Sequence, residues 1–218
     1  MKEIIIIGAG GFGREIKCLI EDINDSNSST NYNILGFVDD GIEKYTPIQN
    51  LKVLGGIDYL NDLKVKPLLA FGIGDPKIKK RIFDTLKSNF IFPTIIHPSV
   101  SLSGYNINIG KGCVICKGTQ LTCDIFISDF VTLNLSCTVG HDTKIEIFSS
   151  FMPSVNISGE VVIKKGVYVG TGAKIINQVE IGENTIIGAG AVVSKSLPND
   201  CTAVGIPAKP IKFHKNNE

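Results

Sequence analysis

The stretch 109–198 decides the fold, because it repeats every six residues: IGKGCV ICKGTQ LTCDIF ISDFVT LNLSCT VGHDTK IEIFSS FMPSVN ISGEVV IKKGVY VGTGAK IINQVE IGENTI IGAGAV VSKSLP. The first position of all fifteen hexapeptides is apolar, whereas chance would place apolar residues in only about six or seven of them. An α-helix would space its apolar residues by three and four, and an amphipathic strand by two. A period of six predicts a parallel β-helix, in which each hexapeptide forms one side of a triangular prism.

The fifth position of most hexapeptides is small or β-branched, for example Cys113, Thr143 and Ala173. Three sides make one coil, so residues eighteen apart stack about 4.8 Å from one another, and the repeat supplies five coils. Beyond the repeat, residues 204–210 (VGIPAKP) contain prolines and a glycine. We expect them to bend the chain across the end of the prism and to cap its open edge.

The segment 2–13 (KEIIIIGAGGFG) indicates a buried parallel strand that runs into a glycine turn. Its glycines fit the pattern G-x-G-x-x-G, and the segment 14–23 that follows has helical apolar spacing. Backbone N–H groups at such a turn, with a helix N-terminus behind them, form an anion site that suits phosphate.

The rest of the N-terminal region predicts a small βαβαβ unit. Further strands are expected at 34–38, 51–54 and 68–73, and helices at 57–63 and 76–88, with Asp75 as the N-cap of the last helix. Asp39 and Asp40 end the second strand, where an acid usually accepts a hydrogen bond from a ribose hydroxyl. The unit is too short for the six strands of a full dinucleotide-binding fold, which argues for a mononucleotide and against an NAD-dependent dehydrogenase. We therefore expect two domains, 1–95 and 96–218.

The composition excludes several partner classes. Lys plus Arg number 22 against 21 for Asp plus Glu, so no field of one sign attracts nucleic acid or a membrane surface. The apolar run 4–7 is too short to span a bilayer and does not resemble a signal peptide. We expect a cytoplasmic protein with six reduced cysteines. The pair Cys113 and Cys116 lacks a second pair that would complete a zinc site, and we interpret both as core residues.

The histidine of the repeat is the candidate catalytic residue. His141 occupies the third position of its hexapeptide, where side chains point outward at a corner. Asp142 follows directly, where it can fix the imidazole tautomer and raise its basicity. Gly159 lies eighteen residues on, one coil above, where its bare N–H can approach a reacting carbonyl. Cys123 lies one coil below and is a conceivable nucleophile with no base besides His141.

Three motifs together resemble a known enzyme family. The glycine turn GAGGFG (8–13), the GHD triplet (140–142) and VGIPAK (204–209) are similar to those of the PglD- and NeuD-like sugar acetyltransferases, which include bacillosamine N-acetyltransferases and sialic-acid O-acetyltransferases. The resemblance covers nearly the whole chain. It implies a Rossmann-like nucleotide-sugar-binding domain and a left-handed β-helix. It also implies a homotrimer without metal, with acetyl-CoA as cosubstrate in the groove between adjacent prisms.

The resemblance also implies roles for individual residues. It assigns the base to His141, the orienting acid to Asp142 and the amide near the thioester carbonyl to Gly159. It places Asn134 near the acceptor sugar, and acetyl-CoA near Ser150, Thr171 and Ala189; many relatives carry a second histidine at the position of Ser150. Residues implied for the nucleotide part of the acceptor are Gly10, Gly11, Phe12, Asp39, Asp40 and Gly74, with Phe12 in place of a frequent histidine.

The expected function is direct transfer of acetyl from acetyl-CoA to the 4-amino group of a nucleotide-linked amino-dideoxysugar, for surface-glycan biosynthesis. Acetylation of a sugar hydroxyl, as on a sialic acid, is the first alternative, because no residue distinguishes an amine from a hydroxyl. A metal hydratase on the same β-helix would need three converging histidines, and the sequence argues against it, because only His141 lies within the repeat, with His97 before it and His214 in the tail. A non-catalytic nucleotide-binding trimeric scaffold would bind nucleotide without acetyl-CoA. The nucleotide base and the sugar stereochemistry stay open.

Overall fold

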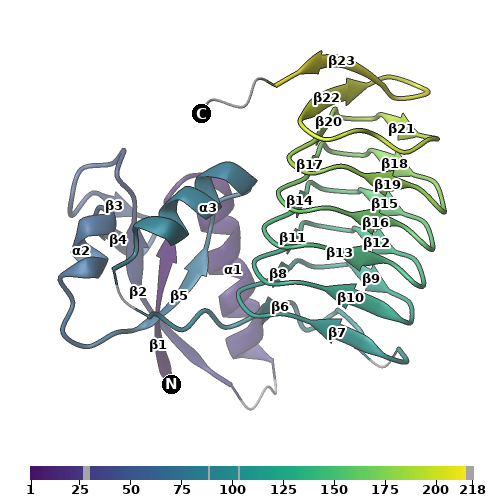
Figure 1. Ribbon diagram of the computed structural model, residues 1–218. Helices are drawn as coiled ribbons and strands as arrows, with labels where there is room; N and C mark the ends of the chain where they lie inside the picture. Colours follow the sequence, from purple (N-terminus) through teal and green to yellow (C-terminus); the bar gives the residue numbers. More distant parts are fainter. Residues whose placement is uncertain (27–29, 88, 103, 215–218) are drawn as a thin grey trace. The chain divides into compact units, whose positions relative to one another are not determined.

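The computed structural model describes residues 1–26, 30–87, 89–102 and 104–214 (Figure 1). The chain divides into two compact units, Met1–Pro98 and Ser99–Glu218. The first unit is an α/β sheet domain and the second is a parallel β-helix, as the sequence predicts.

The first unit is built around a mostly parallel sheet with the strand order β3-β4-β2-β1-β5. Strands β4, β2, β1 and β5 pair in parallel, and the short β3 pairs antiparallel with β4. Its elements are β1 (Lys2–Ile7), α1 (Gly11–Asp25), β2 (Tyr32–Val38), β3 (Pro47–Ile48), β4 (Leu51–Gly55), α2 (Ile57–Asn61), β5 (Leu68–Phe71), α3 (Pro76–Thr85) and β6 (Ile95–Ile96).

Two helices of this unit are shorter than the sequence predicts. Helix α2 ends at Asn61 rather than at 63. Helix α3 ends at Thr85 because Leu86 adopts an extended conformation (φ −71°, ψ 117°), and position 88 of the expected helix lies outside the described residues. Asp75 does cap α3, accepting from two backbone N–H groups. Within the described ranges, no helix has both the length and the apolar character that crossing a bilayer requires.

The apolar run of β1 forms the centre of the first unit. Ile4, Ile5 and Ile6 are completely buried, as expected for a central parallel strand that is covered on both faces. Because β1, β2 and β5 are parallel, their carboxyl ends lie at one edge of the sheet. The glycine turn, Asp39–Asp40 and the loop 72–75 follow these three ends and therefore lie together.

The second unit winds through three parallel sheets, which form the stacked coils of Figure 1. From β7 to β21, partner residues lie eighteen positions apart, for example Thr138 with Asn156 and Val139 with Ile157, whereas β22 pairs with β20 at a spacing of sixteen, for example Ile186 with Thr202. We name the sheets by their first strand. The β7 sheet comprises β7 (Ile107–Ile109), β10 (Ile125–Ile127), β13 (Lys144–Ile145), β16 (Val162–Ile163) and β19 (Glu180–Ile181). The β8 sheet comprises β8 (Val114–Ile115), β11 (Thr132–Leu133), β14 (Ser150–Phe151), β17 (Tyr168–Val169), β20 (Ile186–Ile187), β22 (Cys201–Val204) and β23 (Lys209–Phe213). The β9 sheet comprises β9 (Gln120–Leu121), β12 (Thr138–Val139), β15 (Asn156–Ile157), β18 (Lys174–Ile175) and β21 (Val192–Val193).

The turns between the sheets share one backbone feature. The fourth residue of fourteen hexapeptides has a positive φ, so the chain turns each corner through a left-handed conformation; these residues are Gly112, Gly118, Asp124, Phe130, Ser136, Asp142, Phe148, Ser154, Glu160, Gly166, Gly172, Gln178, Asn184 and Gly190. Glycine, Asp and Asn tolerate this conformation best. Phe130 and Phe148 are unusual there, and their rings stack at 5.0 Å with an interplanar angle of 8°.

The chain beyond the repeat forms a two-stranded end to the β8 sheet. Strand β22 pairs in parallel with β20, and β23 folds back antiparallel on β22 (yellow in Figure 1). The backbone groups of β20 that face away from β17 are therefore paired with protein.

Candidate active site

His141 lies at a corner of the β-helix, in the turn that leaves the β9 sheet after β12. We call residues 140–143 and 158–161, on successive coils, corner 1. The side chain is exposed, and its Nδ1 lies 2.8 Å from Oδ2 of Asp142. An ionised carboxylate only accepts hydrogen bonds, so Nδ1 donates to it, and in the neutral imidazole Nε2 then presents the lone pair. The pair therefore holds the imidazole in the tautomer of a base.

The backbone of corner 1 fixes this pair. Asp142 has a φ of 58°, which the turn requires and which Asp tolerates. Its N–H donates to the carbonyl of Cys123 at 3.3 Å, and the carbonyl of His141 accepts from Glu160 N at 2.7 Å. Contacts to the coils below and above thus hold both residues. No described hydrogen bond joins the Cys123 thiol to His141, and the idea that Cys123 is a nucleophile gains no support.

Gly159 lies directly against the imidazole ring. A Cβ at this position would lie 2.5 Å from Nε2 and 2.6 Å from Cε1 of His141, so no side chain fits there without moving the ring. Among the described residues, no acceptor takes the Gly159 N–H, whereas its carbonyl accepts from Gln178 N at 3.2 Å. The imidazole therefore packs against a residue whose backbone N–H has no acceptor among the described residues.

The other residues expected in the β-helix lie elsewhere. Thr171 and Ala189 are exposed in the turns that enter the β9 sheet; we call residues 134–137, 170–173 and 188–191 corner 2. Asn134 also belongs to corner 2, but it is buried, and its Oδ1 accepts from Leu135 N at 2.6 Å. Corners 1 and 2 lie at opposite edges of the β9 sheet, so one chain does not bring these two groups together.

Ser150 lies at neither corner. It belongs to β14 in the β8 sheet, is completely buried, and its Oγ has no hydrogen-bond partner among the described residues. Its position therefore gives no support to the expectation that it contacts acetyl-CoA.

A second candidate site lies at the edge of the first unit where the parallel strands end. A pocket of about 470 Å³ is lined by all six residues that the sequence assigns to the nucleotide: Gly10, Gly11, Phe12, Asp39, Asp40 and Gly74. Helix α1 begins beside this pocket without a side-chain cap at Gly10 and without an acidic residue in its first turn. Its first N–H groups are therefore available to an anion.

The two acids of this pocket hold its walls as well as lining it. Asp39 accepts from Ala9 N through Oδ2 and from Gly41 N through Oδ1, both at 2.9 Å. Asp40 accepts from Ile57 N at 2.7 Å, at the start of α2. The sequence predicts that both acids accept hydrogen bonds from sugar hydroxyls. In the structure, both carboxylate oxygens of Asp39 and one of Asp40 already accept hydrogen bonds from backbone N–H groups. A carboxylate accepts about four hydrogen bonds, so capacity for a ligand remains.

Sequence reasoning missed the contribution of the helices to the pocket. Ile57 of α2 and Ile78, Arg81 and Ile82 of α3 also line it. The last three follow the i, i+3, i+4 spacing of one helix face, which is visible in the sequence. The position of this face relative to the glycine turn depends on the sheet order, which the sequence alone does not fix.

A shallow hollow also lies beside corner 1, on the outer face of the β7 sheet. It has a volume of about 720 Å³, and Asp142, Lys144, Phe126 and Asn108 are among its lining residues. Asp142 therefore faces both His141 and this hollow. Among the described residues, no three His, Cys, Asp or Glu side chains gather as metal ligands would, so the hydratase alternative gains no support.

Two family models match the chain: "PglD N-terminal domain" over residues 3–86 and "Bacterial transferase hexapeptide (six repeats)" over residues 160–195. GDP-perosamine N-acetyltransferase from Escherichia coli O157:H7 is 30% identical over 214 residues, which are 95% of either chain. The H141N variant of perosamine N-acetyltransferase from Caulobacter crescentus, solved with CoA and GDP-perosamine, has a TM-score of 0.82 at 27% identity, over 97% of this chain and 98% of that one. The acetyltransferase domain of PglB from Neisseria gonorrhoeae FA1090, solved with acetyl coenzyme A, has a TM-score of 0.82 at 27% identity, over 96% of this chain and 99% of that one.

A hexapeptide β-helix with a histidine–carboxylate pair at one corner defines the class, that of the hexapeptide-repeat acyltransferases. The chain belongs to the family of sugar N-acetyltransferases in which a PglD N-terminal domain precedes these repeats.

Proposed function

We propose that the protein transfers acetyl from acetyl-CoA to the 4-amino group of a nucleotide-linked amino-dideoxysugar in surface-glycan biosynthesis. The observation that carries the proposal is the base tautomer of His141 beside the free N–H of Gly159. The pocket of the first unit supports a nucleotide-activated acceptor. The E. coli and C. crescentus relatives, which are named for GDP-perosamine or perosamine, support an amine as the acceptor group.

In this mechanism His141 is the general base. Its Nε2 takes a proton from the sugar amine as the nitrogen attacks the thioester carbonyl carbon, a contribution of typically 10²–10⁴-fold. Asp142 keeps the proton on Nδ1 before the transfer and stabilises the imidazolium after it. Gly159 donates its N–H to the oxyanion of the tetrahedral intermediate. When that intermediate collapses, the CoA thiolate leaves and accepts the proton from His141, so no acyl-enzyme forms.

We also propose that the active unit is a homotrimer. The exposed Thr171 and Ala189 and the buried Asn134 lie across the β9 sheet from His141. If corner 2 of one protomer faces corner 1 of the next, acetyl-CoA can contact Thr171 and Ala189 of one chain while its thioester lies at His141 of the other. This arrangement accounts for the separation of the two groups within one chain.

The substrate is tested by following thiol release from acetyl-CoA with UDP-, dTDP- and GDP-linked 4-amino sugars and with a sialic acid. We expect release with a nucleotide-linked 4-amino sugar and none with the sialic acid. Release with the sialic acid alone would move the activity to O-acetylation. Nucleotide binding with no thiol release from any acceptor would indicate a scaffold instead of an enzyme.

A further inference from the structure

We propose that Arg81 of α3 binds the diphosphate of the nucleotide sugar and so distinguishes nucleoside diphosphates from nucleosides. The inference rests on the proposed function, because it assigns a ligand group to the pocket of the first unit. Nothing in the sequence pattern of the glycine turn points to this residue, since it lies on α3, the helix that follows β5.

The first argument is the charge balance of the pocket. Among the described residues that line it, three carry carboxylates, Asp39, Asp40 and Asp75, and Arg81 is the one basic residue. A nucleoside diphosphate carries at least two negative charges, which three nearby carboxylates would repel. The N–H groups at the start of α1 supply only a partial positive charge of about half a unit. A full positive charge at this site would offset that repulsion.

The second argument is that the carboxylates are already engaged with the backbone. Asp75 accepts from Lys77 N at 2.8 Å and from Ile78 N at 2.9 Å, and Asp39 and Asp40 accept from the N–H groups described above. None of the three pairs with Arg81. The guanidinium is exposed and makes no ion pair or hydrogen bond within the described chain. Its neighbour Lys80, by contrast, pairs with Asp84 at 2.5 Å.

The third argument is the chemistry of the guanidinium. Arg81 shares one face of α3 with Ile78 and Ile82, and all three line the pocket. A guanidinium presents a planar fork of donors that matches two phosphate oxygens at once. Two isoleucines beside a free arginine therefore form a wall that can contact the apolar part of a nucleotide and neutralise its phosphates.

Calorimetric titration of the full chain tests the proposal. UDP, GDP and dTDP, and separately uridine, guanosine and thymidine, are titrated into the wild type, R81A, R81K and K80A. K80A is the matched control, because it removes a basic side chain of the same helix that does not line the pocket. We expect R81A to weaken the diphosphate that the wild type binds by about 10- to 100-fold, as for a lost hydrogen bond to a charged group, and to leave nucleoside binding unchanged. R81K, a point charge without the fork, should recover part of the loss.

Steady-state kinetics provides a second readout. R81A should raise KM for the nucleotide sugar and change kcat little, because phosphate contacts are equally strong in the ground state and the transition state. Unchanged diphosphate affinity in R81A would overturn the proposal, and so would an equal loss for the nucleoside, which would place the guanidinium at the base. If the wild type binds none of the three diphosphates, the proposed function itself fails, and the inference fails with it.

Discussion

At the scale of single residues, the fact that residue 159 is a glycine, with no side chain, matters as much as the imidazole beside it. His141 stays where it is only because Gly159 leaves room for its ring. The spacing of eighteen residues places the two on adjacent coils, and this part of the site is readable from the sequence. The contact between the ring and the glycine, in contrast, depends on the direction of the His141 side chain, which cannot be predicted from the spacing.

The contact predicts a large effect of the smallest substitution. In Gly159→Ala the new Cβ would lie 2.5 Å from Nε2, so the ring must move away from its reacting position. We expect kcat to fall by at least about 100-fold, as in other cases of a displaced catalytic group, while the fold stays intact. Asn177→Ala is the matched control, at the same corner position one coil higher, and should keep its turnover. A Gly159→Ala enzyme with normal kcat would show that the contact has no catalytic role.

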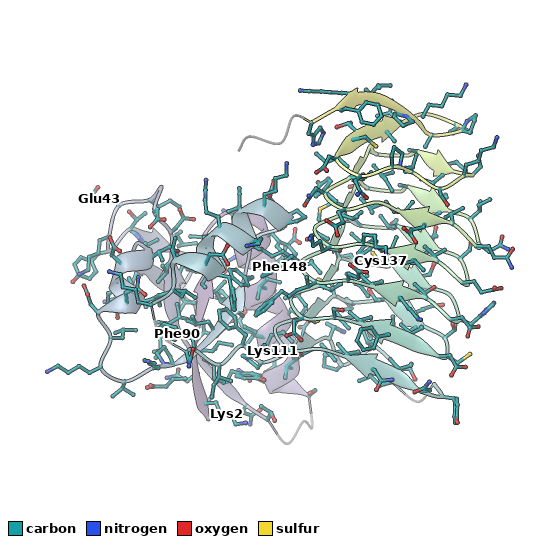
Figure 2. All side chains as sticks on the ribbon, in the orientation of Figure 1. Lys2, Glu43, Phe90, Lys111, Cys137 and Phe148 are labelled. Atoms are coloured by element: carbon teal, nitrogen blue, oxygen red, sulfur yellow. The ribbon has the colours of Figure 1, made fainter. Side chains whose placement is uncertain are left out.

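A second residue-scale prediction concerns the interior of the β-helix. Cys137 (labelled in Figure 2) is completely buried, and burial raises the pKa of its thiol from 9.0 to about 11, although hydrogen bonds with the backbone of Val155 and Asn134 lower it. The folded state therefore keeps a proton that the unfolded chain loses above pH 9. This contribution to stability is complete below pH 9 and is lost as the pH rises to about 11, by up to about 3 kcal/mol.

Urea unfolding at pH 8 and pH 10.5, for the wild type and Cys137→Ala, measures this effect. The wild type should lose more stability than the variant over that interval, because the variant lacks the titrating thiol. Equal losses would show that the burial of Cys137 does not couple to protonation.

At the scale of elements, most two-residue strands of the β-helix have one buried side chain and one that is more exposed, although both residues are buried in β8, β11 and β14. In β19, Ile181 is completely buried and Glu180 is exposed. Ile181→Ala should lower the free energy of unfolding by about 2–5 kcal/mol, and Glu180→Ala by less than about 0.5 kcal/mol. Denaturant unfolding measures both. Equal effects would contradict the assignment of the first hexapeptide position to the core.

The elements also show how far sequence reasoning reaches. The six-residue period predicts every coil of the β-helix, because its apolar position is dictated by the prism. The helix ends at Asn61 and Thr85 are less predictable, since no glycine or proline marks them. The spacing does predict that corner 1 and corner 2 are separate. Residues 141 and 159 are eighteen apart and stack at the same corner, whereas residues 141 and 171 are thirty apart, which is not a whole number of coils. The hydrogen bonds that Asp39 and Asp40 accept from the backbone cannot be predicted without the order of the strands in the sheet, which the sequence alone does not fix.

At the scale of the whole molecule, the separation of corners 1 and 2 predicts an oligomer. Light scattering after size exclusion should give three times the chain mass of 23.5 kDa. Thr171→Tyr should weaken acetyl-CoA binding without changing this mass, because Thr171 is exposed at a turn. A monomer with full activity would contradict the proposed groove between protomers.

The proposal that His141 is the base is tested most directly by comparing kcat of His141→Ala with that of the wild type, for an acceptor that the wild type acetylates. His214→Ala is the matched control, since His214 bonds Thr202 in the C-terminal segment. We expect kcat of His141→Ala to fall by about 10²–10⁴-fold, with nucleotide binding retained and His214→Ala unaffected. Near-normal turnover of His141→Ala would contradict the mechanism.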